Sequence, residues 1–180
     1  MVETGASPAA VDIDGLTVMQ GAWQVASLRY FDSAGAFADA VRESTGESIP
    51  KPLRALRVKS GAGDGCILMW RSPTEALLLC ADHRAFAAIE QRAAAASDGC
   101  LVDQTGGICV LHVTGHRAPD LLSRLGATTA IPALGHALSG RLAELPVVTA
   151  CLQAGEYLLL VERVYADHLL GWIRATAADF

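Results

Sequence analysis

The residues that could do chemistry are few, and Asp103 is the first of them. It ends an apolar stretch and stands directly before Gln-Thr-Gly-Gly. A carboxylate beside a glycine turn could act as a general base or anchor a ligand. An Asp in such a place also accepts hydrogen bonds from the backbone N–H groups of its own turn. Asp103 is therefore a candidate binding residue, with a structural role in the turn as the alternative.

The other acids of interest lie in the second half and at one repeated position. No aspartate occurs between Asp120 and Asp167, so Glu144 is the second candidate binding residue. Glu75 and Glu156 each begin an apolar run, and we expect both to be solvated charges at strand ends.

Histidine and cysteine do not form a recognisable site. His112 and His116 have a spacing found in zinc fingers, but no Cys-x-x-Cys pair accompanies them. A reactive thiolate needs a helix N-terminus or a cationic neighbour, and no cysteine stands at the start of a predicted helix. We therefore predict no catalytic residue, no metal site, and buried free thiols at the five cysteines, which are Cys66, Cys80, Cys100, Cys109 and Cys151.

Composition excludes some classes of protein. The 180 residues carry a net charge of -5 and no cluster of Lys and Arg, which argues against nucleic acid as a partner. Apolar residues make up 52% and mean hydropathy is +0.33, yet no run reaches the roughly 20 residues of a membrane span. High apolarity without a span suggests a subunit of a complex. No secretory signal is visible, so we expect a cytoplasmic protein.

Strands and helices alternate along the chain and must position these residues. Apolar spacing, Asp82 as a helix N-cap and the stop signals Gly46 and Gly126 delimit the elements. The last helix is expected to place Tyr165, Leu169, Trp172 and Thr176 on one face. In chain order the patterns predict a strand at 22–31, a helix at 33–46, two strands within 65–81, a helix at 83–97, a strand at 107–115, a helix at 117–126, two strands at 140–153 and 156–163, and a helix at 164–178.

The second half repeats the order of the first. Glu75 aligns with Glu156 when the triple Leu77-Leu78-Leu79 is placed on Leu158-Leu159-Leu160. The sequence therefore predicts an α+β fold in which two similar β-α-β-β-α units form a pseudo-repeat within one compact domain. The expected divisions are a loose leader over 1–20, a first half over 21–104 and a second half over 105–180.

The stretches "VDQTGGICVLHVTGHRAPDLLSRL", "ALSGRLAELPVVTACLQAGEYLLLVERVYADHLLGWIRATA" and "WRSPTEALLL" together resemble the gamma subunit of heterotetrameric sarcosine oxidase. The resemblance covers roughly residues 65 to 177. That family is in turn similar to the folate-binding domain of the glycine-cleavage aminomethyltransferases. It implies the same α+β fold as the pattern of the residues does.

The resemblance also implies a function. The complex oxidises sarcosine to glycine, produces hydrogen peroxide, and passes the one-carbon unit to tetrahydrofolate. FAD, FMN, NAD and tetrahydrofolate belong to the larger, flavin-bearing subunits, which would be the partners of this chain. The acid expected to hold folate is missing, and no Gly-x-Gly-x-x-Gly motif is present, so the chain is expected to be accessory and non-catalytic.

Three readings follow from this. In the first, the chain covers larger subunits, with Trp23, Trp70 and Trp172 as candidate interface residues and core packing as the alternative role of each. In the second, it is a stand-alone tetrahydrofolate-binding or one-carbon transfer protein. In the third, it is a small-molecule sensing module.

Overall fold

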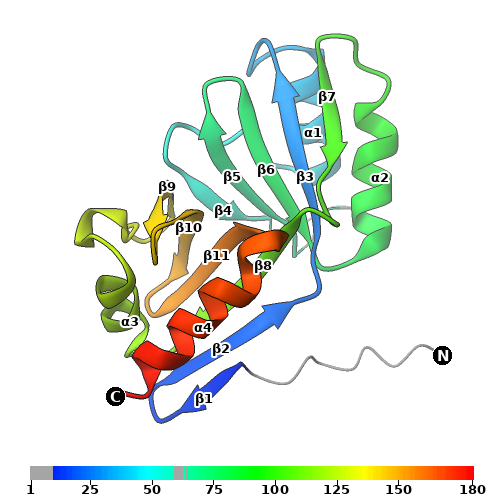
Figure 1. Ribbon diagram of the computed structural model, residues 1–180. Helices are drawn as coiled ribbons and strands as arrows, with labels where there is room; N and C mark the ends of the chain where they lie inside the picture. Colours follow the sequence, from blue (N-terminus) through cyan, green and yellow to red (C-terminus); the bar gives the residue numbers. More distant parts are fainter. Residues whose placement is uncertain (1–9, 59–62, 64) are drawn as a thin grey trace, which may run out of the picture.

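The chain forms two antiparallel sheets in the computed structural model, which describes residues 10–58, 63 and 65–180 (Figure 1). The six-stranded sheet has, in spatial order, β1 (Val11–Ile13), β2 (Leu16–Gly21), β8 (Ile108–Thr114), β11 (Glu156–Glu162), β10 (Leu145–Gln153) and β9 (His136–Leu142). The five-stranded sheet has β4 (Ala55–Arg57), β5 (Ile67–Ser72), β6 (Glu75–Cys80), β3 (Gln24–Tyr30) and β7 (Gly99–Asp103).

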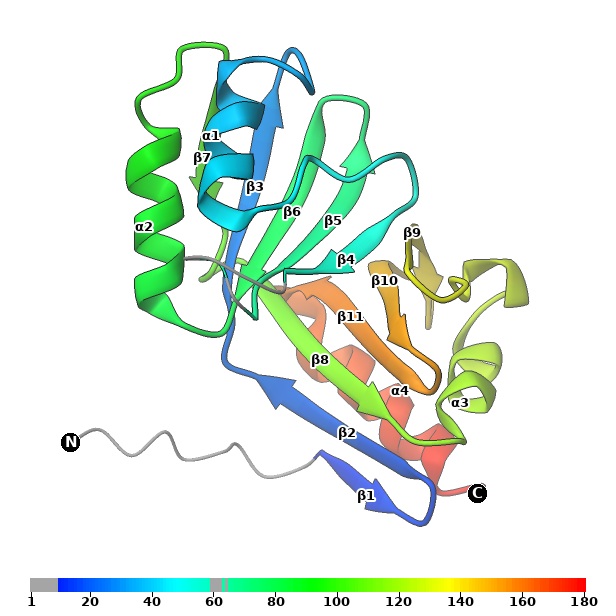
Figure 2. The same ribbon diagram turned by 180° about the vertical axis from the view of Figure 1, so that it is seen from behind.

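In the described ranges, four α-helices cover the outer faces of the two sheets. They are α1 (Ala36–Thr45), α2 (His83–Ala93), α3 (Ala118–Leu125) and α4 (Ala166–Ala177). Helices α1 and α2 lie against the five-stranded sheet, as Figure 2 shows from behind, and α3 and α4 lie against the six-stranded sheet. None of the helices in the described part of the chain is long and apolar enough to cross a membrane. The α+β class predicted from the sequence is confirmed.

Alternation along the strands builds three cores between these layers. Leu78 packs towards α1 and α2, while Leu77 and Leu79 point to the other sheet, because successive strand residues face opposite ways. In β11, Leu159 packs towards α3 and α4 while Leu158 and Leu160 enter the core between the sheets.

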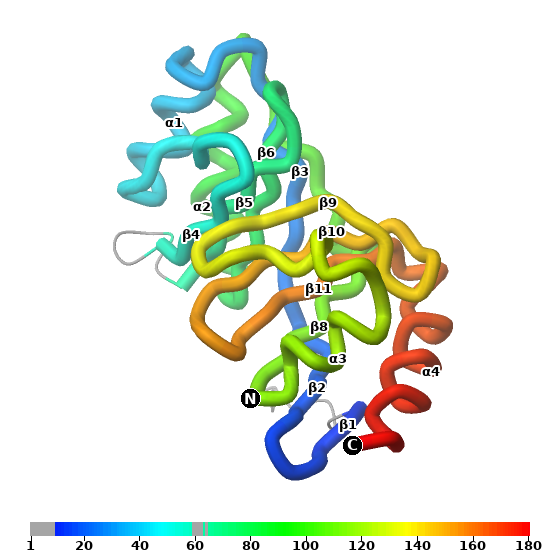
Figure 3. Tube along the Cα trace, turned by 90° about the vertical axis from the view of Figure 1, so that its left-hand side faces the viewer, coloured from blue at the N-terminus to red at the C-terminus, as the bar shows by residue number. Residues whose placement is uncertain are grey.

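The two sheets are joined along one margin, where β9 and β10 lie beside β4 and β5 (Figure 3). Ala55 N donates to the carbonyl of Gly135 at 3.0 Å, and Ala137 N donates to the carbonyl of Leu53 at 2.8 Å. These bonds hold the edge of one sheet against the edge of the other.

Each half has, between its first helix and its strand pair, one strand that the predicted β-α-β-β-α unit lacks, and the first half also ends in a further strand, β7. The first half runs β3-α1-β4-β5-β6-α2, and the second runs β8-α3-β9-β10-β11-α4. The prediction of one strand over 140–153 is wrong because the chain turns at Ala143 and Glu144, both with positive φ (49° and 63°). Such two-residue turns usually carry Asn-Gly or Asp-Gly, so Ala-Glu gave no turn signal.

Residues 11–20 do not form the expected loose leader. Strands β1 and β2 make a hairpin, and β2 is hydrogen-bonded to β8, with Leu16 and Val18 fully buried. The prediction failed there because the alternating stretch is short and its partner strand lies about half the chain away. Residues 1–9 lie outside the described part of the chain.

Strand β2 precedes the first half in the chain but belongs to the sheet of the second half. β2 leads directly into β3 but pairs with β8, whereas β7 leads directly into β8 but pairs with β3. The chain crosses between the sheets after β2 and again over Gln104–Gly107.

The prediction of five free thiols is wrong for two of them. Cys66 and Cys80 form a disulfide, and Cys100, Cys109 and Cys151 are free, although Cys100 is exposed rather than buried as predicted. Cys66 directly precedes β5 and Cys80 ends β6, so the pairing of Ile67 with Leu79 places the two cysteines opposite each other. The sequence alone could not supply this register.

Candidate functional site

Asp103, the first candidate binding residue, is the last residue of β7 and is exposed. One carboxylate oxygen accepts a hydrogen bond from the backbone N–H of Thr105 at 2.8 Å. Hydrogen bonding from the side chain and backbone of Thr105 holds the pKa of Asp103 below its usual range. This is the turn-stabilising role that the sequence offered as the alternative.

Glu144, the second candidate, lies in the turn between β9 and β10 with its side chain 94% exposed. Its nearest charged partner is Arg141, at 3.6 Å. Asp103 belongs to the five-stranded sheet and Glu144 to a turn of the six-stranded sheet, so the two candidates come from different sheets. An exposed acid of this kind gains no reactivity from its surroundings.

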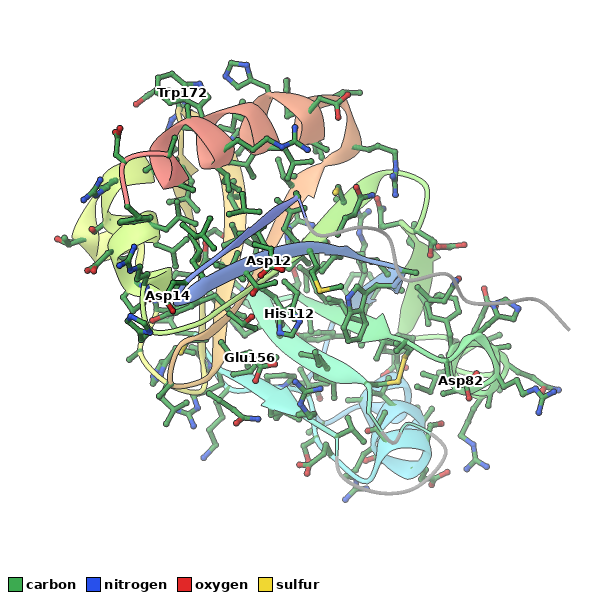
Figure 4. All side chains as sticks on the ribbon, turned by 90° about the horizontal axis from the view of Figure 1, so that it is seen from below. Asp12, Asp14, Asp82, His112, Glu156 and Trp172 are labelled. Carbon is green, nitrogen blue, oxygen red and sulfur yellow. A yellow bond between two sulfur atoms is a disulfide. The ribbon has the colours of Figure 1, made fainter. Side chains whose placement is uncertain are left out.

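The three tryptophans differ in exposure. Trp23 and Trp70 are half-buried, whereas Trp172 is 52% exposed on the outer face of α4 (Figure 4). The expected face of this helix is wrong, because Leu169, Ile173 and Ala177 are buried while Trp172 points away. Core packing is thereby excluded for Trp172 within this chain.

The structure assembles a cluster that the sequence analysis did not expect, which we call the Glu156 cluster. It comprises Glu156, His112 and Arg57, and the first two lie side by side in Figure 4. Arg57 Nη2 donates to Glu156 Oε1 at 2.9 Å, and His112 Nε2 lies 3.0 Å from the same oxygen. Because Arg57 comes from β4 and the other two from the six-stranded sheet, the cluster links the sheets.

A second cluster surrounds the matching acid in the first half, and we call it the Glu75 cluster. Glu75 accepts hydrogen bonds from Ser27 Oγ and from Arg71 Nη1, the latter at 3.3 Å. Ser27 is paired with Leu77 across β3 and β6, just as His112 is paired with Leu158 across β8 and β11. The signal in the sequence was the alignment of the two glutamates.

Glu75 and Glu156 are therefore not the solvated strand-end charges that the sequence predicted. Their side chains are only 19% and 15% exposed. Glutamate is seldom this buried unless a cation or hydrogen-bond donor accompanies it, and both glutamates have such partners. Their partners come from strands that the linear sequence does not place together.

Two of the three free thiols, Cys109 and Cys151, are buried, and Cys100 is exposed. Burial raises the pKa of Cys109 and of Cys151, so both thiols stay protonated near neutrality. Within residues 10–58, 63 and 65–180, no group of three or more His, Cys, Asp or Glu side chains could hold a metal ion. In both the Glu156 cluster and the Glu75 cluster, the carboxylate is bound by side chains of this chain.

Comparisons with known proteins identify the fold. No family model matches the chain, and no curated protein matches its sequence. Among solved structures, the chain is similar to a chain of heterotetrameric sarcosine oxidase from Corynebacterium sp. U-96, solved with pyrrole 2-carboxylate. The TM-score is 0.78 at 17% identity, covering 96% of this chain and 88% of that one.

A second similar structure is the glycine cleavage system aminomethyltransferase T from Bartonella henselae. The TM-score is 0.65 at 13% identity and the match covers 88% of this chain. The chain spans 45% of the length of that enzyme. The suspected resemblance thus agrees with the structure: this chain has the fold found in a chain of heterotetrameric sarcosine oxidase and in part of aminomethyltransferase T.

Proposed function

We propose that the chain is an accessory, non-catalytic gamma-type subunit of a sarcosine oxidase complex. The observation that carries the proposal is the match over nearly the whole length of both chains with a chain of heterotetrameric sarcosine oxidase. The internal chemistry supports it, because both buried glutamates are occupied by partners within the chain. Sarcosine oxidation and one-carbon transfer to tetrahydrofolate would be carried out by the assembly.

The cofactors of that reaction would be held by the partner subunits. FAD, FMN, NAD and tetrahydrofolate would bind the larger chains, and this chain would stabilise their arrangement in the cytoplasm. In support, Asp103 is used by its own turn and Glu144 projects from an exposed one, so neither is arranged to orient a pterin.

Trp172 is the strongest of the three candidate interface residues. Large aromatic side chains are enriched in protein interfaces, and this one is exposed beside Gly171 and Ala175 on the same helix. Val164, just before α4, is a second exposed apolar side chain, at 79%. Trp23 and Trp70 already pack within the chain and would contribute less.

Co-expression with the flavin-bearing subunits tests the proposal. We expect a stable assembly on size-exclusion chromatography, with sarcosine oxidation only when the partners are present. Trp172→Ala should weaken the assembly at least tenfold, whereas Phe31→Ala, which truncates a more exposed aromatic side chain (88%) remote from α4, should not. Separate elution of all chains at micromolar concentration would count against a subunit role.

The alternative is a stand-alone tetrahydrofolate-binding or one-carbon transfer protein, favoured by the match with aminomethyltransferase T. It requires that the isolated chain bind the pterin. Titration with tetrahydrofolate, monitored by the fluorescence of half-buried Trp23 and Trp70, tests this directly. A saturable change in the absence of partners would support the alternative, and a flat response would remove it.

A further inference from the structure

A cavity of about 560 Å³ opens where the two sheets meet beside the crossing turn Gln104–Gly107, and we call it the seam cavity. Its walls come from both halves of the chain. Arg29 and Glu75 are contributed by the five-stranded sheet, and Glu162 and Arg163 by the end of β11. The crossing turn is visible at the waist of the molecule in Figure 1.

Two of the arginines that line the seam cavity, Arg163 and Arg71, already bind groups of this chain. Arg163 donates from Nε to the carbonyl of Gly106 at 2.8 Å and from Nη2 to the carbonyls of Thr105 and Ile108. These bonds hold the turn in place. Because all three acceptors are backbone carbonyls, the positive charge of Arg163 has no carboxylate partner among them. Arg71, which also lines the cavity, has one contact with Glu75 at 3.3 Å.

Two charges of opposite sign on the walls remain unused. Among the described residues, Arg29 and Glu162 take part in no ion pair, although both line the seam cavity. Arg29 lies on β3 of one sheet and Glu162 ends β11 of the other. A cation and an anion that face one cavity without pairing are free to bind a ligand that carries both charges.

An apolar space adjoins the charged one. A smaller cavity of about 140 Å³ shares Arg71, Gln104, Ile108 and Glu162 with the seam cavity. Its remaining wall is largely aliphatic and comes from both sheets, including Leu77, Val148 and Leu160. Binding sites of this kind combine an apolar lining with a few polar groups that fix the orientation of the ligand.

We propose that the seam cavity binds a free α-amino acid with an apolar side chain. Its carboxylate would be held by Arg29 and Arg71, its ammonium group by Glu162, and its side chain by the adjoining aliphatic space. The site depends only on this chain, so it does not rest on a role in sarcosine oxidation.

Isothermal titration of the isolated full chain with L-leucine tests the proposal. We expect saturable binding to leucine. Binding should be at least tenfold weaker to 4-methylpentanoate, which lacks the ammonium group, and to 3-methylbutylamine, which lacks the carboxylate, since each loses a charge-assisted contact. Absence of binding to leucine, or equal binding to either analogue, would overturn the proposal.

Two variants test the assigned residues. Arg29→Gln and Glu162→Gln change exposed side chains, so both should fold, and each should weaken leucine binding at least tenfold. The matched control is Arg84→Gln, which removes an exposed arginine on α2 and should bind leucine as the parent does. Unchanged affinity in both seam variants, with a circular dichroism spectrum like that of the parent, would refute the assignment.

Discussion

Replacing Glu156 by Gln removes the negative charge at the centre of the Glu156 cluster while keeping the size of the side chain. In the parent, one carboxylate oxygen contacts Arg57 of the other sheet at 2.9 Å and His112 at 3.0 Å. The Glu156 side chain is only 15% exposed, so water replaces the lost contacts poorly. We expect a measurable loss of stability without a change of fold.

The size of the loss follows from the burial of the partners. A hydrogen bond to a charged group contributes about 1.5–3 kcal/mol. Arg57 and His112 are 39% and 36% exposed, so solvent screening reduces the contribution of each contact. We therefore expect Glu156→Gln to lower the free energy of unfolding by about 2 kcal/mol, which corresponds to roughly 4–8 °C in Tm.

Glu43→Gln is the matched control for this measurement. Glu43 contacts Arg92 at 3.0 Å, but their side chains are 62% and 54% exposed. An exposed pair of this kind should contribute less than about 0.5 kcal/mol. Urea unfolding followed by circular dichroism measures both variants. Equal losses in the two would refute the argument that burial, rather than the ion pair itself, gives the Glu156 cluster its contribution.

Three further perturbations test other parts of the structure. Reduction of the disulfide between Cys66 and Cys80, which closes a loop of roughly 15 residues, should lower the free energy of unfolding by about 3 kcal/mol, and a Cys66→Ser/Cys80→Ser variant should not respond to reductant. Burial raises the pKa of Cys109, so the folded chain binds more protons than the unfolded chain above about pH 8.5. The free energy of unfolding should therefore fall as pH rises through that range. Cys109→Ala should make this fall with pH less steep, as measured by urea unfolding at several pH values. Gly115→Ala should destabilise by at least about 2 kcal/mol, because φ is +117° and a Cβ would overlap the carbonyl of the β1–β2 turn, while Gly106→Ala, with open space around it, serves as the control in thermal unfolding.

The helices could be predicted because their signals are local. Asp82 caps α2 by accepting from the backbone N–H of Arg84 at 2.8 Å, and Gly46 ends α1 in the left-handed conformation at φ 74°. The buried face of α4 could not, because large apolar residues lie on more than one side of it. Spacing placed Leu169 and Trp172 on one face, whereas the structure buries Leu169 together with Ile173 and exposes Trp172.

The clusters between the sheets depend on pairings that a single sequence does not reveal. Arg57 and Glu156 are far apart in the chain, and nothing in either neighbourhood indicates the other. The two candidates chosen from local context lie at turns: Asp103 ends β7 directly before one, and Glu144 is within another. Short polar segments between apolar runs most often form turns, and their side chains then stabilise the turn. The burial and the ion pairs of a residue such as Glu156 depend on partners far away in the chain, so the residues next to it in the sequence do not indicate them.

The pairing of β2 with β8 makes the two halves of the molecule inseparable. A peptide ending at residue 104 would keep β2 without the β8 that pairs with it, and the remainder would present a bare hydrogen-bonding edge along β8. The first piece would hold every strand of the five-stranded sheet, but neither piece would hold a complete six-stranded sheet, so the pieces would either associate or aggregate. Unfolding should therefore proceed as one cooperative event, and modules ending at this point could not be exchanged between proteins without the six-stranded sheet being divided.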